Sequence, residues 1–250
     1  MKKVLLARRY NDKAKEQENQ ALYDKFIGLY SADVEHALDY LNGSINKVSI
    51  VTNGKRQAIN DKAYVTARLR KVRLLAAIAG DVDLPDIRQL IDKQKLNVTL
   101  TGNPVLAEYN ICRQLQDELS EMYRTYAPQK ARQAEIGAVR LEVLTRLALI
   151  AKERVDQAAD LPGWLDVARD TFLTIEANHK DPKNTEISNV AVNTANLHMG
   201  KLLQGLASEF HSDVVNNFVA DILKIEKGQD ETRLDYEQAI LRKVAADYLQ

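Results

Sequence analysis

The sequence predicts an all-α protein, a multi-helix bundle of about eight to ten helices with a long antiparallel helical hairpin. Apolar residues recur every three or four positions along most of the 250 residues, which is the spacing of the buried face of a helix. Ten glycines and five prolines are too few for a turn-rich β-sandwich or barrel. The 45% of apolar and 28% of charged residues are typical of a globular protein rather than of a disordered or fibrous one.

Two amphipathic stretches on either side of Pro128 are the strongest architectural signal. Apolar residues recur at helical spacing over 104–126 and again over 136–155. A proline disfavours the helical conformation of the residue before it, so the first helix should end near Tyr126. Long helices joined by so short a connection fold back on each other, and we expect an antiparallel hairpin over 104–157.

The ends of the remaining helices are predicted from capping residues and from helix-breaking residues. After the hairpin, Asp160-Leu161-Pro162 is typical of a helix start, and a polar break follows at 179–184. Before the hairpin, Asn42-Gly43 is expected to stop one helix and Asn60 to cap another. The expected helices are 14–30, 32–41, 60–80, 83–96, 104–126, 128–157, 161–178, 187–206, 213–228 and 234–248.

A minor β-hairpin is the alternative left open in the N-terminal part. Residues 44–52 are rich in β-branched side chains and precede Asn53-Gly54, a pair that favours tight hairpin turns. Residues 97–101 are a second β-like piece, and pairing between the two segments is the less favoured alternative. A helix-turn-helix over 33–44 fits poorly, because the following segment is β-branched, and a plain helical corner is the favoured interpretation there.

The net charge of zero conceals an uneven distribution. Residues 1–75 hold 15 basic and 8 acidic side chains, a net of +7, whereas residues 76–250 hold 20 and 27, a net of −7. We therefore divide the chain into a basic, mostly helical N-terminal part, 1–101, and an acidic helical domain, 102–250. A uniformly basic coat is excluded, and the opposite charges predict head-to-tail contacts between copies.

The most basic stretch, 55–73, is a candidate nucleic-acid-binding segment for DNA or RNA, extended by a basic arm at residues 2–9. Its net charge is +6, because Asp61 is its single acidic residue. At helical spacing, Lys62, Arg70 and Arg73 fall on one flank and Arg68 and Lys71 on the other, so an ordinary solvated face is the competing interpretation. The candidate residues are Lys55, Arg56, Lys62, Arg68, Arg70, Lys71 and Arg73.

Catalytic and metal-binding signatures are missing from the sequence, and we expect no cofactor. There is no Gly-x-Ser-x-Gly, Gly-x-x-x-x-Gly-Lys or Gly-x-Gly-x-x-Gly pattern. Glu176 and His179 have the Glu-x-x-His spacing of di-iron bundles, but no other histidine repeats it. Cys112 falls on the apolar face of its helix, where a buried inert thiol is expected. An enzyme with a carboxylate-lined helical cleft is the least favoured alternative.

Cysteine usage and hydropathy predict a cytoplasmic protein with no membrane partner. A single cysteine excludes an intramolecular disulfide. The apolar stretch after Lys3 ends at Arg8 and Arg9, so it is too short to be the apolar region of a signal peptide. No apolar run approaches the roughly 18 residues of a membrane span. The location fits a cellular protein or one made by a virus inside a cell.

The order of a basic N-terminal part, a helical hairpin and an acidic remainder resembles the small subunits of phage DNA-packaging machines. The resemblance covers residues 1–157 at the level of architecture, matches no diagnostic motif and assigns no residue a role. It implies a hairpin that builds an oligomer and an N-terminal helical domain that holds DNA. The long amphipathic hairpin over 104–157, together with the missing catalytic signatures, leads us to expect a non-catalytic helical interaction or assembly protein, acting as a homo-oligomer or with a protein partner.

Overall fold

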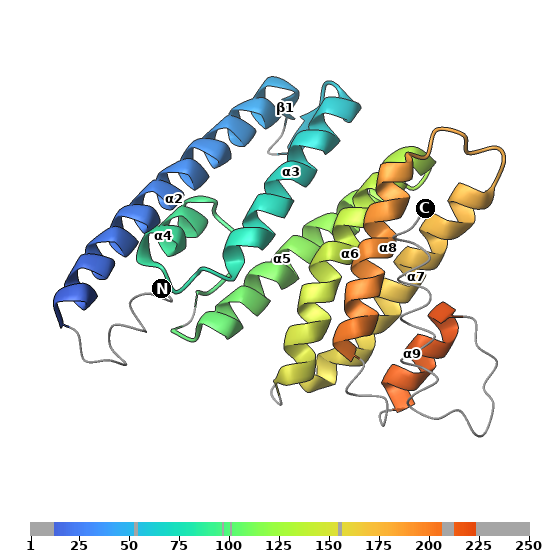
Figure 1. Ribbon diagram of the computed structural model, residues 1–250. Helices are drawn as coiled ribbons and strands as arrows, with labels where there is room; N and C mark the ends of the chain where they lie inside the picture. The colour runs from blue at the N-terminus through green and yellow to red at the C-terminus, as the bar shows by residue number, and fades with distance from the viewer. Residues whose placement is uncertain are drawn as a thin grey trace. The chain divides into compact units, whose positions relative to one another are not determined.

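The computed structural model describes residues 13–52, 55–96, 98–100, 102–154, 157–206 and 213–223. Within these residues it has eight α-helices, a two-stranded sheet and a single 3-10 turn, which confirms the all-α prediction (Figure 1). The chain divides into two compact units, 1–74 with 81–95 (unit 1) and 75–80 with 96–250 (unit 2). The helix expected over 234–248 and the basic arm at 2–9 lie outside the described residues.

The first helix of unit 1, α2 (Lys13–Lys47), is one unbroken helix of 35 residues. The sequence predicted two helices ending at Asn42-Gly43, and this prediction is wrong. Leu41 and Ile45 on either side of that pair are both buried, as is Ser31 at the expected earlier break. Burial on this side outweighs the cost of about 1 kcal/mol that a glycine imposes inside a helix.

Two further helices complete the helical part of unit 1, and polar contacts join them to α2. In α3 (Asp61–Ala79), the predicted cap is confirmed, because Asn60 Oδ1 accepts a hydrogen bond from the Ala63 N–H at 3.1 Å. The next helix, α4 (Pro85–Lys93), starts at the predicted proline. Lys71 Nζ of α3 donates to Asn42 Oδ1 of α2 at 2.7 Å, and Lys93 Nζ of α4 donates to Glu35 Oε1 of α2 at 2.8 Å. Residues next to these helices add Tyr30 Oη to Asp81 Oδ2 at 2.7 Å and Asn42 Nδ2 to Gln94 Oε1 at 3.2 Å.

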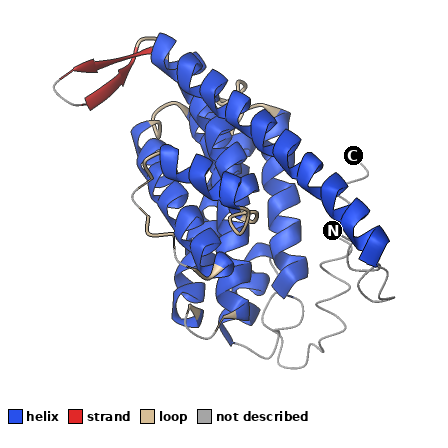
Figure 2. Ribbon diagram, turned by 90° about the vertical axis from the view of Figure 1, so that its left-hand side faces the viewer, coloured by secondary structure: helices blue, strands red, loops and turns tan. Residues whose placement is uncertain are grey.

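The β-hairpin follows α2 directly and projects from its end (Figure 2). Strand β1 (Ser49–Thr52) pairs antiparallel with β2 (Lys55–Ala58), from Ser49 opposite Ala58 to Thr52 opposite Lys55. This pairing confirms the minor β-hairpin at Asn53-Gly54. The less favoured pairing with 97–101 is not found, since the described residues 98–100 form no strand. A partner two residues away closes a much smaller loop than one more than forty residues away. Because α2 leads straight into this hairpin, 33–44 is neither a helix-turn-helix nor a helical corner.

Unit 2 begins with the predicted helical hairpin, α5 (Pro104–Thr125) and α6 (Lys130–Glu153). Asn103 Oδ1 caps α5 by accepting a hydrogen bond from the Leu106 N–H at 3.2 Å. Arg146 of α6 pairs with Glu108 of α5 at 3.2 Å, and Arg140 bonds Ser120 at 3.1 Å. Residue numbers fall on α6 as they rise on α5, so the two helices are antiparallel.

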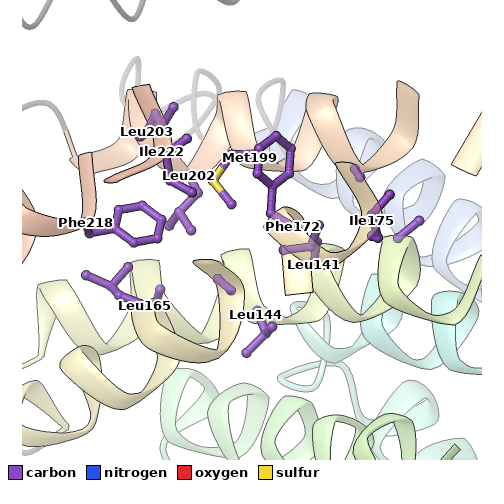
Figure 3. Close-up of a cluster of buried hydrophobic side chains, with 14 of the residues drawn as sticks. Leu141, Leu144, Leu165, Phe172, Ile175, Met199, Leu202, Leu203, Phe218 and Ile222 are labelled. Carbon is purple, nitrogen blue, oxygen red and sulfur yellow. The ribbon is translucent and has the colours of Figure 1, made fainter. Parts of the chain in front are cut away.

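The remaining helices of unit 2 surround α6. The 3-10 turn Ala158–Asp160 leads into α7 (Leu161–Lys180), followed by α8 (Asn189–Leu206) and α9 (Asp213–Leu223). Buried residues occur on all sides of α6, which packs against α5, α7 and α8. Figure 3 shows the resulting core, whose labelled side chains are Leu141, Leu144, Leu165, Phe172, Ile175, Met199, Leu202, Leu203, Phe218 and Ile222. Across the described helices, none is both long and apolar enough to cross a membrane.

Candidate functional site

Three of the seven basic candidates lie together on the exposed side of α3. They are spaced eight and three residues apart, so at 3.6 residues per turn they share one helix face. All three side chains are solvent-exposed, and the row consists of Lys62, Arg70 and Arg73. We call these three residues the α3 basic row.

The other described candidates are occupied by contacts within unit 1. The Arg68 guanidinium lies over the Tyr64 ring, 5.7 Å from its centroid, and donates a hydrogen bond to its hydroxyl at 3.2 Å. Lys71 Nζ donates to Asn42 Oδ1 of α2 at 2.7 Å. Arg56 Nη1 donates to Asn46 Oδ1 and Ser49 Oγ, both at 2.8 Å. Lys55 begins β2, and its side chain lies outside the described part.

A groove of about 400 Å³ separates α2 from the start of α3 within unit 1. Its polar lining combines hydroxyl, amide and cationic groups, and none of its lining residues is a carboxylate. The polar residues are Tyr40, Ser44, Asn60, Lys62, Thr66 and Arg70. The groove thus joins part of the α3 basic row to an exposed tyrosine of α2.

The outward side of α2 carries an exposed apolar row that the sequence analysis missed. Leu22, Phe26 and Leu29 are spaced by four and three residues, and Phe26 is 66% exposed. Among 20–22 and 24–30, no side chain is buried. Tyr40, 72% exposed, continues the same face further along the helix. We call Leu22, Phe26, Leu29 and Tyr40 the α2 stripe.

Exposed large apolar side chains are concentrated in unit 1. Of the ten found among the described residues, seven belong to this unit, which is the smaller of the two. Besides the α2 stripe they include three residues in and next to the β-hairpin, Ile50, Val51 and Ile59. Single exposed apolar residues are normal, but a row on one helix face is typical of an interaction surface.

The buried polar groups of unit 2 hold its helices together. Tyr109 Oη donates a hydrogen bond to Asp160 Oδ2 at 2.5 Å and accepts one from Trp164 Nε1 at 3.0 Å. Burial, and then the bond to Asp160, raises the pKa of Tyr109 to about 12. Arg140 bonds Thr171 Oγ1 and Ser120 Oγ, both at 3.1 Å, and burial lowers its pKa. These bonds link α5, α6 and α7 into one bundle.

The carboxylate and metal alternatives find little support in the described geometry. A second cavity, of about 300 Å³ in unit 2, is lined by Lys130, Arg132 and Lys183 with one carboxylate, Glu186. Glu176 Oε2 pairs with Lys180 at 3.5 Å. Within the part of the chain that the structure describes, no three His, Cys, Asp or Glu side chains lie close enough to hold a metal ion. His211 lies outside that part.

Cys112 is fully buried on α5, and its thiol links stability to pH. Burial raises its pKa from 9.0 to about 12. Between these values the unfolded thiol has lost its proton and the folded one keeps it, so the free energy of unfolding falls as pH rises above about 9. From pH 8 to pH 10 the native protein should lose about 1 kcal/mol more than Cys112→Ala, measured by urea unfolding. Equal losses in the two proteins would contradict the buried thiol.

Comparison of the chain with known protein families, with curated protein sequences and with solved structures finds no match. The resemblance to phage DNA-packaging subunits therefore remains one of sequence organisation. The candidate functional surfaces are the α2 stripe and the α3 basic row of unit 1.

Proposed function

We propose that this chain is a non-catalytic helical assembly protein, copies of which associate through the α2 stripe. The observation that carries the proposal is the exposed apolar row Leu22, Phe26 and Leu29 on a helical segment with no buried side chain among its described residues. In proteins most of the stability of a helix comes from the packing of an apolar face rather than from helix propensity. A partner on this face would supply that packing.

The size of the stripe is sufficient to drive association. Burying a Leu or Phe side chain contributes roughly 1.5–3 kcal/mol relative to leaving it in water. In a symmetric pair each copy contributes the same side chains, so the apolar gain doubles. This gain opposes the cost of bringing two chains together, which is at least about 4 kcal/mol.

The proposal is tested by replacing Phe26 with glutamate. Light scattering coupled to size-exclusion chromatography, over a range of concentrations, should show the native chain as more than a monomer. Phe26→Glu should weaken association about a hundredfold or more, because a carboxylate cannot be buried in an apolar contact without a large cost. The matched control is Val190→Glu on α8, where the valine is 74% exposed, and it should associate like the native protein.

The salt dependence of association distinguishes contact through the α2 stripe from the head-to-tail contact that the charge distribution predicts. Apolar association persists at high ionic strength, whereas contacts between the +7 and −7 parts are screened. Association that disappears in 0.5 M salt and survives Phe26→Glu would favour the head-to-tail route. A native chain that is monomeric at every concentration and salt would contradict assembly altogether.

Nucleic-acid binding is the second candidate, favoured by the α3 basic row. Lys62, Arg70 and Arg73 are exposed on one face, which suits contacts to successive phosphates. Binding of labelled duplex DNA or RNA that weakens steeply with salt would support this candidate, and no binding in 50 mM salt would rule it out. A cytoplasmic location and a viral origin remain expectations of the sequence alone, and an enzyme with a carboxylate-lined cleft remains its least favoured alternative.

A further inference from the structure

The α2 stripe extends into a longer heptad row. Starting at Leu22, the positions that follow at alternating spacings of four and three residues all lie on α2, and this spacing is that of the a and d positions in a coiled coil. An aspartate and a histidine, Asp33 and His36, lie in the middle of the row, and both are exposed. The row is Leu22, Phe26, Leu29, Asp33, His36, Tyr40, Gly43 and Lys47.

The carboxylate of Asp33 and the imidazole of His36, which has an N–H that can donate to a carboxylate, discriminate between ways of pairing two copies. In a parallel, in-register pair, Asp33 faces the partner's Asp33 and His36 faces the partner's His36, so like groups meet. In one antiparallel register, Asp33 of each copy faces His36 of the other copy, so the dimer contains two such contacts. The same register places Leu22 against the partner's Lys47 at the two ends of the row, where the lysine ammonium can reach water along its flexible stem. A shift by one heptad in one direction would place Asp33 against the partner's Leu29, and in the other direction Leu29 against the partner's Lys47, so that a charge would oppose an apolar side chain nearer the middle of the row, at a cost.

The side-chain sizes favour the same antiparallel register. In it, Leu29 faces the partner's Tyr40, and Phe26 faces the partner's Gly43. A Cβ placed on Gly43 would have no neighbour within 4 Å, so there is open space there for a large ring. Phe26, the largest of the three residues Leu22, Phe26 and Leu29, thus faces Gly43, the smallest residue of the row.

We infer that the partner of the α2 stripe is the α2 stripe of a second copy, packed antiparallel with Asp33 of each chain against the partner's His36. The inference rests on the proposed function and deepens it by naming the partner and the register. The paired row runs from 22 to 47, about 39 Å of helix. An antiparallel pair is isologous, so it closes as a dimer rather than growing into a filament.

Disulfide cross-linking tests the register. Leu29→Cys and Tyr40→Cys are made as separate variants, and mild oxidation of their mixture should give a covalent dimer, because these positions face each other. Each variant alone should give none, since identical positions lie about 16 Å apart along the pair, beyond the roughly 7 Å limit between Cα atoms. The native Cys112 is fully buried and does not compete.

A charge exchange tests orientation without cysteines. Asp33→Lys and His36→Glu should each weaken association, with His36→Glu losing about tenfold because two carboxylate pairs are created per dimer. The double variant places Lys against Glu in the antiparallel pair and should restore association to within about threefold of the native protein. In a parallel pair the double variant faces Lys with Lys and Glu with Glu, so it is not restored.

The outcomes separate the inference from the proposed function. Cross-linking of either single-cysteine variant with itself would overturn the antiparallel register while leaving assembly through the stripe intact. Loss of association in Phe26→Glu with no mixed cross-link would show that the stripe binds a different surface of the second copy. A native chain without any self-association would overturn both.

Discussion

Replacing Phe172 with alanine is expected to lower the free energy of unfolding of unit 2 by about 3–5 kcal/mol. The ring is 1% exposed and lies in the core cluster, among side chains of α6, α8 and α9 (Figure 3). Truncation removes the apolar contacts of the ring and leaves a cavity that the surrounding helices fill only in part. Urea unfolding followed by circular dichroism measures the loss.

Val190→Ala is the matched control for this prediction, because Val190 belongs to α8 of the same unit but is 74% exposed. Its free energy of unfolding should stay within about 0.5 kcal/mol of that of the native protein. A loss of less than about 1 kcal/mol in Phe172→Ala would show that the Phe172 ring is not packed in the core.

Gly137→Val is expected to destabilise unit 2 by about 2–3 kcal/mol. A Cβ at this position of α6 would lie 2.9 Å from Ile175 Cδ1 and 3.0 Å from Tyr123 Cε2. Tyr123 lies on α5 and Ile175 on α7, so glycine is what allows both neighbours to approach α6 here. The three added carbons must displace these two packed side chains, and the same unfolding measurement reports the cost.

Gly163→Val provides the control for the steric argument. Gly163 lies on α7 of the same unit, and a Cβ there would meet no atom within 4 Å. The free energy of unfolding of this variant should remain within about 0.5 kcal/mol of the native value. If both variants behaved alike, the close approach of α5 and α7 to Gly137 would be refuted.

The elements that the sequence predicted correctly are those whose signals are local. The cap at Asn60, the start of α4 at Pro85 and the hairpin around Pro128 each depend on side chains within a few residues of the boundary. Helical spacing also correctly assigned the basic residues of α3 to two different sides of the helix. Lys62, Arg70 and Arg73 share one face because they are spaced at multiples of the helical turn.

The elements that the sequence predicted wrongly are those in which distant packing outweighs a local signal. Asn42-Gly43 is a typical helix stop, yet α2 continues through it because Leu41 and Ile45 are buried in the unit 1 core. The minor β-hairpin at Asn53-Gly54, by contrast, is a local element and is confirmed, although its second strand, Lys55–Ala58, has two charged residues in four and lacks an apolar pattern of its own. Its pairing follows from proximity along the chain rather than from β-propensity.

By itself the sequence determined the helical class, the hairpin of α5 and α6, and the uneven charge. Only the tertiary structure decided which faces of the helices remain exposed. Helix α2 has two apolar rows, one through Val34, Leu38 and Leu41 and another through Leu22, Phe26 and Leu29. Periodicity alone treats both rows as core, but α3 and α4 of unit 1 cover the first and leave the second in solvent. Exposure is a property of the neighbours that pack on a helix, and those neighbours are distant in sequence.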